Sequence, residues 1–214
     1  MSKKIFWIIG IIAVCLIGII VLTNVQTESA KIDYEGQPYL GEESAPVEIV
    51  EFGDYKCPHC GEFNSSFVPF IKEEFVETGK AKFYFMNYSF IAFDSTISAQ
   101  FAETVYKELG NETFWEFHDL LFANQTNASG KENVLTEEFL KAILLEVASL
   151  EETEKVIEAF KNDGGTKALD HDMGIAKGLG INSTPTIYIG GEKFTGQTLD
   201  DFREMVEEAA KNDQ

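Results

Sequence analysis

The residues of this chain with the clearest chemical potential are Cys57 and Cys60, which are separated only by Pro58 and His59. They follow an apolar, β-branched run at residues 47–52 that has the composition of a buried strand. A Cys-x-x-Cys pair between a strand and the start of a helix is typical of redox chemistry. The spacing therefore predicts that the two sulfurs cycle between a dithiol and a disulfide.

The two cysteines are expected to have different roles. Cys57 would lie at the helix N-terminus, where unpaired N–H groups and the positive end of the helix dipole stabilise a thiolate. Cys60, one turn further along, would be the more buried, resolving thiol. Pro58 suits the first helical turn, and His59 would place a positive charge or a donor beside the thiolate. A low thiolate pKa makes the disulfide a stronger oxidant.

Two other roles for the cysteine pair have less support in the sequence. A structural zinc site needs four ligands, and beyond the pair only His59, His118 and His171 are available, without a ligand-type repeat. A buried pair with no redox role is the other alternative. No role is assigned to His118 or His171.

Composition and charge narrow the class of protein. The 214 residues suit one domain, or one domain with a sizeable insertion, and the 44% hydrophobic content suits a packed core. The net charge of −19 excludes nucleic acid as a partner. Three cysteines, one of them isolated at position 15, do not make a disulfide-stapled scaffold.

The N-terminus predicts export. Lys3 and Lys4 precede an uncharged apolar run at residues 5–22, whose 18 residues would form a helix of about 27 Å, close to the hydrocarbon thickness of a bilayer. An uncleaved membrane anchor is favoured over a cleaved signal peptide, because no small-x-small cleavage site follows the run. Either segment would leave the folded domain outside the cytoplasm, in an oxidising compartment.

The pattern along the chain is that of an α/β protein with a thioredoxin-like fold and an inserted all-helical domain. The domains expected are an anchor or signal with a tether at 1–30, a thioredoxin-like domain at 31–90 and 164–214, and a helical insertion at 91–163. The elements expected are strands at 47–52 and 81–90, helices at 57–78 (kinked at Pro69), 94–109, 112–122, 136–150, 151–162 and 166–179, a hairpin at 186–195 and a closing helix at 199–211.

Two stretches resemble a known family. The run PYLGEESAPVEIVEFGDYKCPHC, residues 38–60, is similar to the opening of DsbA-like thiol–disulfide oxidoreductases, and Cys-Pro-His-Cys is typical of oxidising members. Its lead-in suits the membrane-tethered BdbD-type branch of Gram-positive bacteria. The run GINSTPT, residues 180–186, resembles the family's cis-proline loop. The resemblance covers about residues 37–212.

The resemblance implies further site residues. Pro185 would be cis, with Thr184 facing Cys57 and its backbone pairing with an extended substrate as an added strand. Tyr55 and Thr184 would lie on the substrate-binding surface. Glu51 would be a buried carboxylate that exchanges protons with Cys60; the alternative is an acid on the solvent face of the strand.

No cofactor is expected beyond the Cys57–Cys60 disulfide, although acids gather where the helical insertion begins and ends. A structural calcium ion would use Glu103 and Asp170 as its leading candidates. A solvated acidic face is the more ordinary interpretation. The acids considered are Asp94, Glu103, Asp163, Asp170 and Asp172.

The predicted function is that of a monomeric extracytoplasmic oxidase that introduces disulfide bonds into unfolded or newly exported cysteine-containing proteins. The resemblance implies that a quinone-linked membrane partner reoxidises it. One alternative is a thiol reductant or isomerase, for example in cytochrome maturation; His59 and the lack of a dimerisation module argue against it. The other is a non-catalytic chaperone or binding module on the same scaffold.

Overall fold

The computed structural model describes residues 7, 29–125 and 133–212. The chain divides into two compact units, Met1–Ala30 and Lys31–Gln214. The anchor expected at residues 5–22 lies outside the described residues, apart from Trp7. Within the ranges described, no helix is both long and apolar enough to cross a bilayer.

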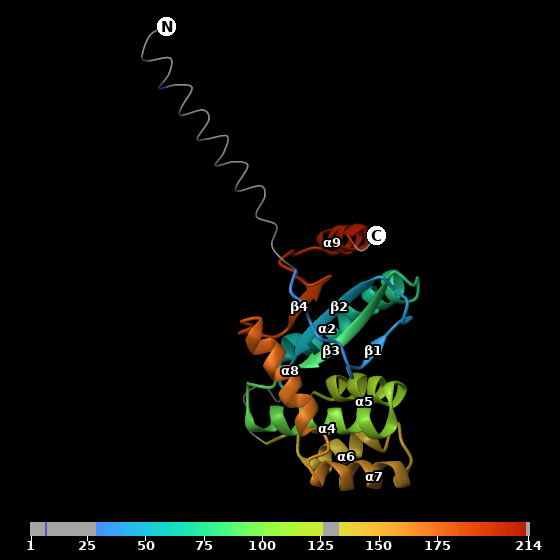
Figure 1. Cartoon of the computed structure of the whole chain (residues 1–214). Helices are drawn as coiled ribbons and strands as arrows, with labels where there is room; N and C mark the ends of the chain where they lie inside the picture. Colours follow the sequence, from blue (N-terminus) through green and yellow to red (C-terminus); the bar gives the residue numbers. More distant parts are fainter. Residues whose placement is uncertain (1–6, 8–28, 126–132, 213–214) are drawn as a thin grey trace. The chain divides into compact units, whose positions relative to one another are not determined.

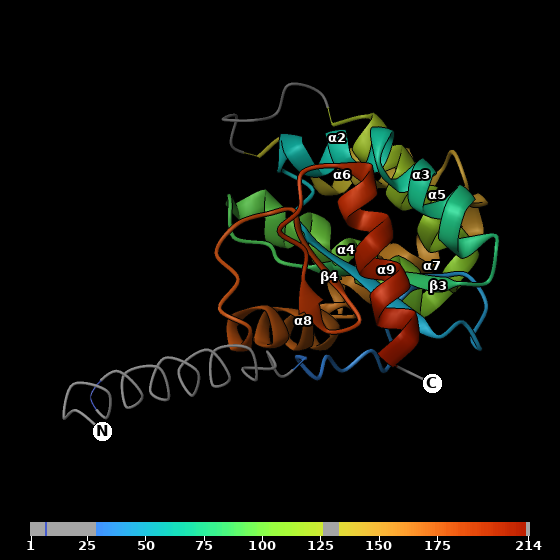
Figure 2. The same cartoon turned by 90° about the horizontal axis from the view of Figure 1, so that it is seen from above.

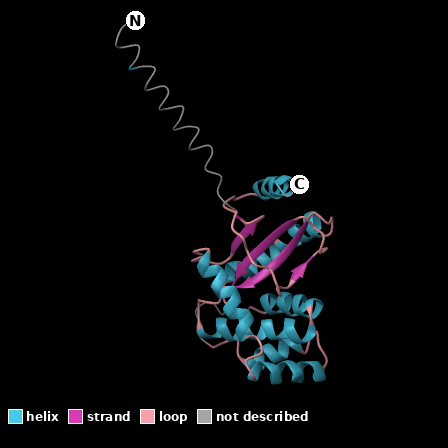
Figure 3. Ribbon diagram, in the orientation of Figure 1, coloured by secondary structure: helices cyan, strands magenta, loops and turns pink. Residues whose placement is uncertain are grey.

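A five-stranded mixed sheet forms the centre of the unit Lys31–Gln214 (Figure 1, and in magenta in Figure 3). The strands lie side by side in the order β1 (Tyr39–Leu40), β3 (Ala81–Asn87), β2 (Val47–Gly53), β4 (Thr186–Ile189) and β5 (Glu192–Lys193). Only β2 and β3 are parallel; the other neighbours are antiparallel. Because β2 has a partner on each side, its carboxyl end, which leads to the cysteines, is held at the middle of the sheet.

The helix expected from residue 57 to 78 is three pieces: α2 (Pro58–Ser66), α3 (Val68–Ile71) and the π-helical turn η1 (Lys72–Val76). The break falls at Phe67, and Pro69 lies in the first turn of α3, where its missing N–H costs no hydrogen bond. Aromatic side chains of this run share one face. The rings of Phe67, Phe70 and Phe75 all pack on Phe202 of α9 (Leu199–Asn212).

Between β3 and β4, the described residues form helices and no strand. These helices follow one another in the order that the sequence predicts. They are α4 (Phe93–Leu109), α5 (Asn111–Ala123), α6 (Glu137–Leu144), α7 (Leu150–Lys161) and α8 (Thr166–Gly178). The helix expected at 136–150 ends early, at Leu144. A turn and a bend follow at residues 145–148, and a capping box, in which Ser149 and Glu152 bond each other's backbone N–H, then starts α7 as a new helix.

The helices α4 to α7 gather at one end of this unit, and α9 lies at the other (Figure 1 and, from above, Figure 2). Helix α4 packs against α5, α7 and α8, and α8 also packs on β3. One hydrophobic cluster includes both Ile49 of the sheet and Phe101 of α4, so the helices and the sheet share a core. The boundaries expected for the insertion, 91–163, stay a prediction.

Candidate active site

Cys57 lies where the central strand passes into the first helix. It is the N-cap residue of α2, with φ −79° and ψ 115°, and Pro58 occupies the first helical turn. Its backbone N–H donates to the carbonyl of Asp54 over 2.8 Å, which closes the turn between β2 and α2. Cys57 and Cys60 are both buried and both free thiols in this structure.

The surroundings shift the pKa values of the two thiols in opposite directions. The pKa of Cys57 is lowered to about 6, chiefly because the Cys60 thiol hydrogen-bonds to its sulfur, with help from the backbone N–H groups of Cys60 and His59. The pKa of Cys60 is raised, first by burial and then by the Cys57 sulfur. The geometry therefore matches the expected pair of an ionised outer thiol and a protonated inner one.

His59 and Pro58 lie on the outer side of this turn. The imidazole of His59 is 77% exposed, and its Nδ1 lies 3.1 Å from a carboxylate oxygen of Glu62. That contact raises the pKa of His59. The backbone N–H of His59 lowers the pKa of Cys57, and the charge of Cys57 raises the pKa of the His59 ring. A direct effect of the ring on the thiolate stays a prediction.

Glu51 is fully buried in β2, paired with Phe85 of β3 and Ile187 of β4. The alternative of an acid on the solvent face is therefore wrong. Burial raises the pKa of Glu51 well above its usual value, the charge of Cys57 raises it further, and the Cys60 thiol opposes the shift. The raised pKa favours the protonated form of the Glu51 carboxyl group beside Cys60, and proton exchange between the two stays a prediction.

The loop before β4 faces the active cysteine. The Thr184–Pro185 peptide bond is cis, and the carbonyl oxygen of Thr184 lies 3.2 Å from Sγ of Cys57. Thus residues 127 positions apart meet at the reacting sulfur. The placement expected for Thr184 and Pro185 is what the structure shows; their role in substrate binding stays a prediction.

Tyr55 lies inside the protein, away from the surface expected for it. Its side chain is 1% exposed, and its hydroxyl lies 3.0 Å from Nδ1 of His118 on α5. The ring packs on Phe85 and Phe122. Burial lowers the pKa of His118 to about 3, so this imidazole is neutral. Tyr55 thus packs in the core beneath the active-site turn. The pattern of apolar and polar residues in this turn did not indicate that Tyr55 is buried.

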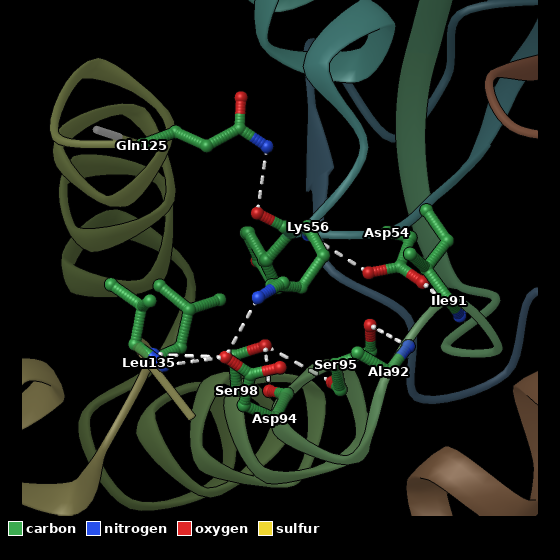
Figure 4. Close-up of polar contacts among 11 residues, drawn as sticks. Asp54, Lys56, Ile91, Ala92, Asp94, Ser95, Ser98, Gln125 and Leu135 are labelled. Carbon is green, nitrogen blue, oxygen red and sulfur yellow. Dashed lines mark hydrogen bonds and ion pairs between the residues drawn. The ribbon is translucent and has the colours of Figure 1, made fainter. Parts of the chain in front are cut away.

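Sequence reasoning missed two polar residues that hold the turn (Figure 4). The carboxylate of Asp54 accepts hydrogen bonds from the backbone N–H groups of Lys56, Phe90 and Ile91, at 2.8 to 3.1 Å. Gln125, just after α5, donates from Nε2 to the carbonyls of Tyr55 and Cys57, at 2.7 and 2.9 Å. An acid directly after a strand was a detectable sign for Asp54, whereas Gln125 is 70 residues from Tyr55 and gave none.

The two leading calcium candidates differ in burial. Asp170 is exposed, whereas Glu103 is buried and accepts a hydrogen bond of 2.7 Å from Asn87. The carboxyl group that shares a hydrogen bond with Glu103 is that of Asp172, which lies on another face of α8 from Asp170. In the described ranges, no group of three or more His, Cys, Asp or Glu residues could hold a metal ion. Calcium, and Glu103 and Asp170 as its ligands, stay predictions.

Fold and site together define a thiol–disulfide oxidoreductase built on a thioredoxin-like fold. Residues 33–208 match the family model described as Thioredoxin. Disulfide bond formation protein D of Bacillus subtilis (strain 168) is 32% identical over 184 residues, covering 86% of this chain and 81% of that protein. A probable disulfide bond formation protein D of Bacillus cereus is 33% identical over 183 residues, covering 83% and 81%.

A solved structure agrees with these relatives. The crystal structure of oxidised BdbD from Bacillus subtilis matches with a TM-score of 0.78 and 32% identity, covering 86% of this chain and 97% of that one. The chain therefore belongs to the thioredoxin-like family of DsbA-type disulfide bond formation proteins. It is a protein thiol–disulfide oxidoreductase that oxidises its substrates, as its resemblance to that family implies.

Proposed function

We propose that the Cys57–Cys60 disulfide introduces disulfide bonds into newly exported, unfolded proteins. The observation that carries the proposal is the environment of Cys57. Its sulfur lies at the N-cap of α2 beside the carbonyl of Thr184, and its pKa is lowered to about 6. A thiolate that is stable at neutral pH favours the dithiol form of the enzyme, and so makes its disulfide an oxidant.

The reaction is a two-step transfer of two electrons. A substrate thiolate attacks Sγ of Cys57, the bond between Cys57 and Cys60 breaks, and a mixed disulfide forms on Cys57. A second substrate thiolate then attacks the substrate sulfur of that bond. Cys57 leaves as a thiolate, the substrate gains one disulfide, and the enzyme is left as a dithiol. The low pKa of Cys57 assists the second step because lower-pKa thiolates leave faster.

Glu51 is proposed to manage the proton of the inner thiol. When the first attack releases Cys60 as a thiolate, that sulfur is buried and its pKa is raised, so it needs a proton at once. Glu51 lies buried beside it with a raised pKa, and is therefore able to hold a proton at neutral pH. Reoxidation of the enzyme would run the same transfer backwards.

The substrate surface proposed includes the Thr184 backbone and an exposed apolar patch. Phe90, Ile91 and Phe93 are 47%, 44% and 75% exposed, which is unusual for three large apolar side chains so close in sequence. The N–H groups of Phe90 and Ile91 bond Asp54, so this patch is attached to the turn that carries Cys57 (Figure 4). Unfolded chains expose apolar side chains that such a patch would bind.

We further propose that the enzyme works at the outer face of the cell membrane. The apolar run at residues 5–22, with Lys3 and Lys4 before it, supports anchoring. An anchor would keep the enzyme near a quinone-linked membrane reoxidase. That partner is inferred from the resemblance to the DsbA-type family.

The reductant or isomerase alternative differs in the direction of electron flow. It predicts a reduction potential near or below about −270 mV, the value typical of thioredoxin, whereas the oxidase predicts a markedly higher one. The low pKa of Cys57 favours the oxidase. The chaperone alternative predicts that binding of unfolded protein persists when the cysteines are replaced, with no effect on disulfide formation.

The test is a pair of cysteine variants in cells that lack their own disulfide oxidase. We expect Cys57→Ser to abolish disulfide formation, because the attacked sulfur is gone. Cys60→Ser cannot form the enzyme disulfide, so it should abolish disulfide formation as well. Its Cys57 thiolate should still attack substrate disulfides, releasing a substrate thiolate, and the resulting mixed disulfides should accumulate on non-reducing gels because no inner thiol can release them. Disulfide formation by the Cys57→Ser variant at the wild-type level would refute the assignment of Cys57.

A further inference from the structure

One side chain of the helical part bonds directly to the backbone of the active-site turn. Nε2 of Gln125 lies 2.7 Å from the carbonyl oxygen of Tyr55 and 2.9 Å from that of Cys57. A glutamine amide has two N–H donors, and here each serves one carbonyl. Gln125 lies just beyond the C-terminal end of α5, so the bond joins the helices to the residue that carries the reacting sulfur.

The active-site helix leaves room for this amide by having no side chain at Gly61. A Cβ atom built on Gly61 would collide with Oε1 of Gln125. Gly61 lies inside α2 and has an ordinary helical backbone, so it is not required for a turn. Glycine in a helix interior costs about 1 kcal/mol relative to alanine. The space it leaves is filled by the Gln125 side chain.

Other hydrogen bonds also hold the backbone of this turn. The peptide unit between Tyr55 and Lys56 has its carbonyl on Gln125 and its N–H on the Asp54 carboxylate. The carbonyl of Cys57 accepts from Gln125 and from the N–H groups of Cys60 and Gly61. The peptide unit between Tyr55 and Lys56 and the one between Cys57 and Pro58 therefore both have a fixed orientation.

We propose that Gln125 is a positioning residue for the redox reaction: its amide fixes these two carbonyls and so keeps the N–H groups at the start of α2 directed at Sγ of Cys57. The inference rests on the proposed role of Cys57. Loss of the amide removes one hydrogen bond from each carbonyl: the Cys57 carbonyl keeps the N–H groups of Cys60 and Gly61, whereas the Tyr55 carbonyl loses its described donor. The turn that carries Cys57 is then held less firmly, and the N–H groups at the start of α2 are less well directed at its sulfur. The outer thiol becomes harder to ionise and a poorer leaving group.

The test measures the Cys57 pKa from thiolate absorbance, together with the rate at which the oxidised enzyme oxidises a peptide dithiol. In Gln125→Ala we expect the pKa to rise by about one unit. We expect the rate at neutral pH to fall severalfold. The neighbouring Asn124→Ala is the matched control, because the Asn124 amide bonds only Leu120 of its own helix among the contacts described.

Gly61→Ala separates positioning from folding. Its methyl group displaces the Gln125 amide, while alanine strengthens α2. We expect the same rise in the Cys57 pKa as in Gln125→Ala, with unfolding stability not lowered, and no further rise in the double variant. This variant also carries the test if Gln125→Ala does not fold.

Two results would have different meanings. If Gly61→Ala leaves the Cys57 pKa and the oxidation rate at the wild-type values, as Asn124→Ala should, the positioning role is wrong. Cys57→Ser must remove the thiolate titration altogether. If a titration with the same midpoint persists in that variant, the fault lies in the assignment of Cys57, and the proposed function itself fails.

Discussion

Cys57 and Cys60 are three residues apart, yet only one of them ionises near neutral pH. The difference arises from position on the helix: Cys57 caps α2 and receives hydrogen bonds, while Cys60 lies one turn deeper against buried Glu51. A pair of thiols with separated pKa values gives the reaction an order. The outer sulfur accepts and leaves, and the inner one waits in its protonated form.

This asymmetry predicts how stability depends on pH. The pKa of Cys57 is about 6 in the folded protein and near 9 without these contacts. A group with a lowered pKa stabilises the fold above its unfolded pKa, and that stabilisation is lost as pH falls through its folded pKa. The stability of the reduced protein, relative to that of the oxidised protein, should therefore fall between about pH 9 and pH 6.

The measurement is urea unfolding of both redox forms across that range. The oxidised form is the control, because neither Cys57 nor Cys60 has a thiol to ionise there and the remaining titrating groups are the same in both forms. A stability difference between the two forms that does not change with pH would contradict the lowered pKa of Cys57.

At the scale of residues, the sequence predicted the site residues whose environment is made by neighbouring parts of the chain. Cys57 and Cys60 could be assigned because strand, turn and helix dipole are neighbours in the chain. Three-dimensional contacts decided the rest. Asp172, rather than Asp170, meets Glu103, because two positions on a helix turn a side chain to another face. The pairing of Gln125 with the turn depends on 70 intervening residues and left no local pattern.

Among the elements, the active-site turn and α4 are joined by a buried ion pair. Nζ of Lys56 lies 3.0 Å from Oδ2 of Asp94, and both side chains are at most 2% exposed. The same carboxylate oxygen accepts from the backbone N–H groups of Val134 and Leu135, which lead into α6 (Figure 4). One carboxylate thus ties together three segments that are distant in sequence.

Replacing Asp94 by alanine should be costly. It leaves a buried ammonium group and two backbone donors without this carboxylate, and breaking a buried pair typically costs about 3–5 kcal/mol of unfolding free energy. Asp119→Ala is the control: it removes the half-exposed partner of Lys72, and such pairs contribute at most about 1 kcal/mol. Urea unfolding measures both. Equal losses of unfolding free energy in the two variants would contradict the expectation that the buried carboxylate of Asp94 contributes more to stability than the half-exposed one of Asp119.

Element boundaries were predictable where the chain carries capping or breaking residues, and were less so elsewhere. The aromatic face of residues 63–75 was evident from its spacing, but the division at Phe67 and the π-helical turn that follows were not. They depend on how this run fits against α9 and the sheet, as the contacts of Phe202 show.

The whole chain combines a strongly acidic composition with a basic, apolar N-terminus. We expect the full-length protein to sediment with membranes and to resist salt extraction, because an apolar helix, rather than surface charge, would hold it there. The unit Lys31–Gln214, expressed alone, should stay in the soluble fraction. Cell fractionation of both forms measures this. A shortened protein in the medium would instead indicate a cleaved signal peptide.

The contact between Gly61 and Gln125 also bears on how relatives of this chain can diverge. A side chain at position 61 and an amide at position 125 would compete for the same space. A substitution at either position therefore changes what is tolerated at the other. Aligned relatives should show the two positions covarying, with glutamine at 125 retained only where 61 is glycine, and this pairing would trace the history of the link between helices and active site.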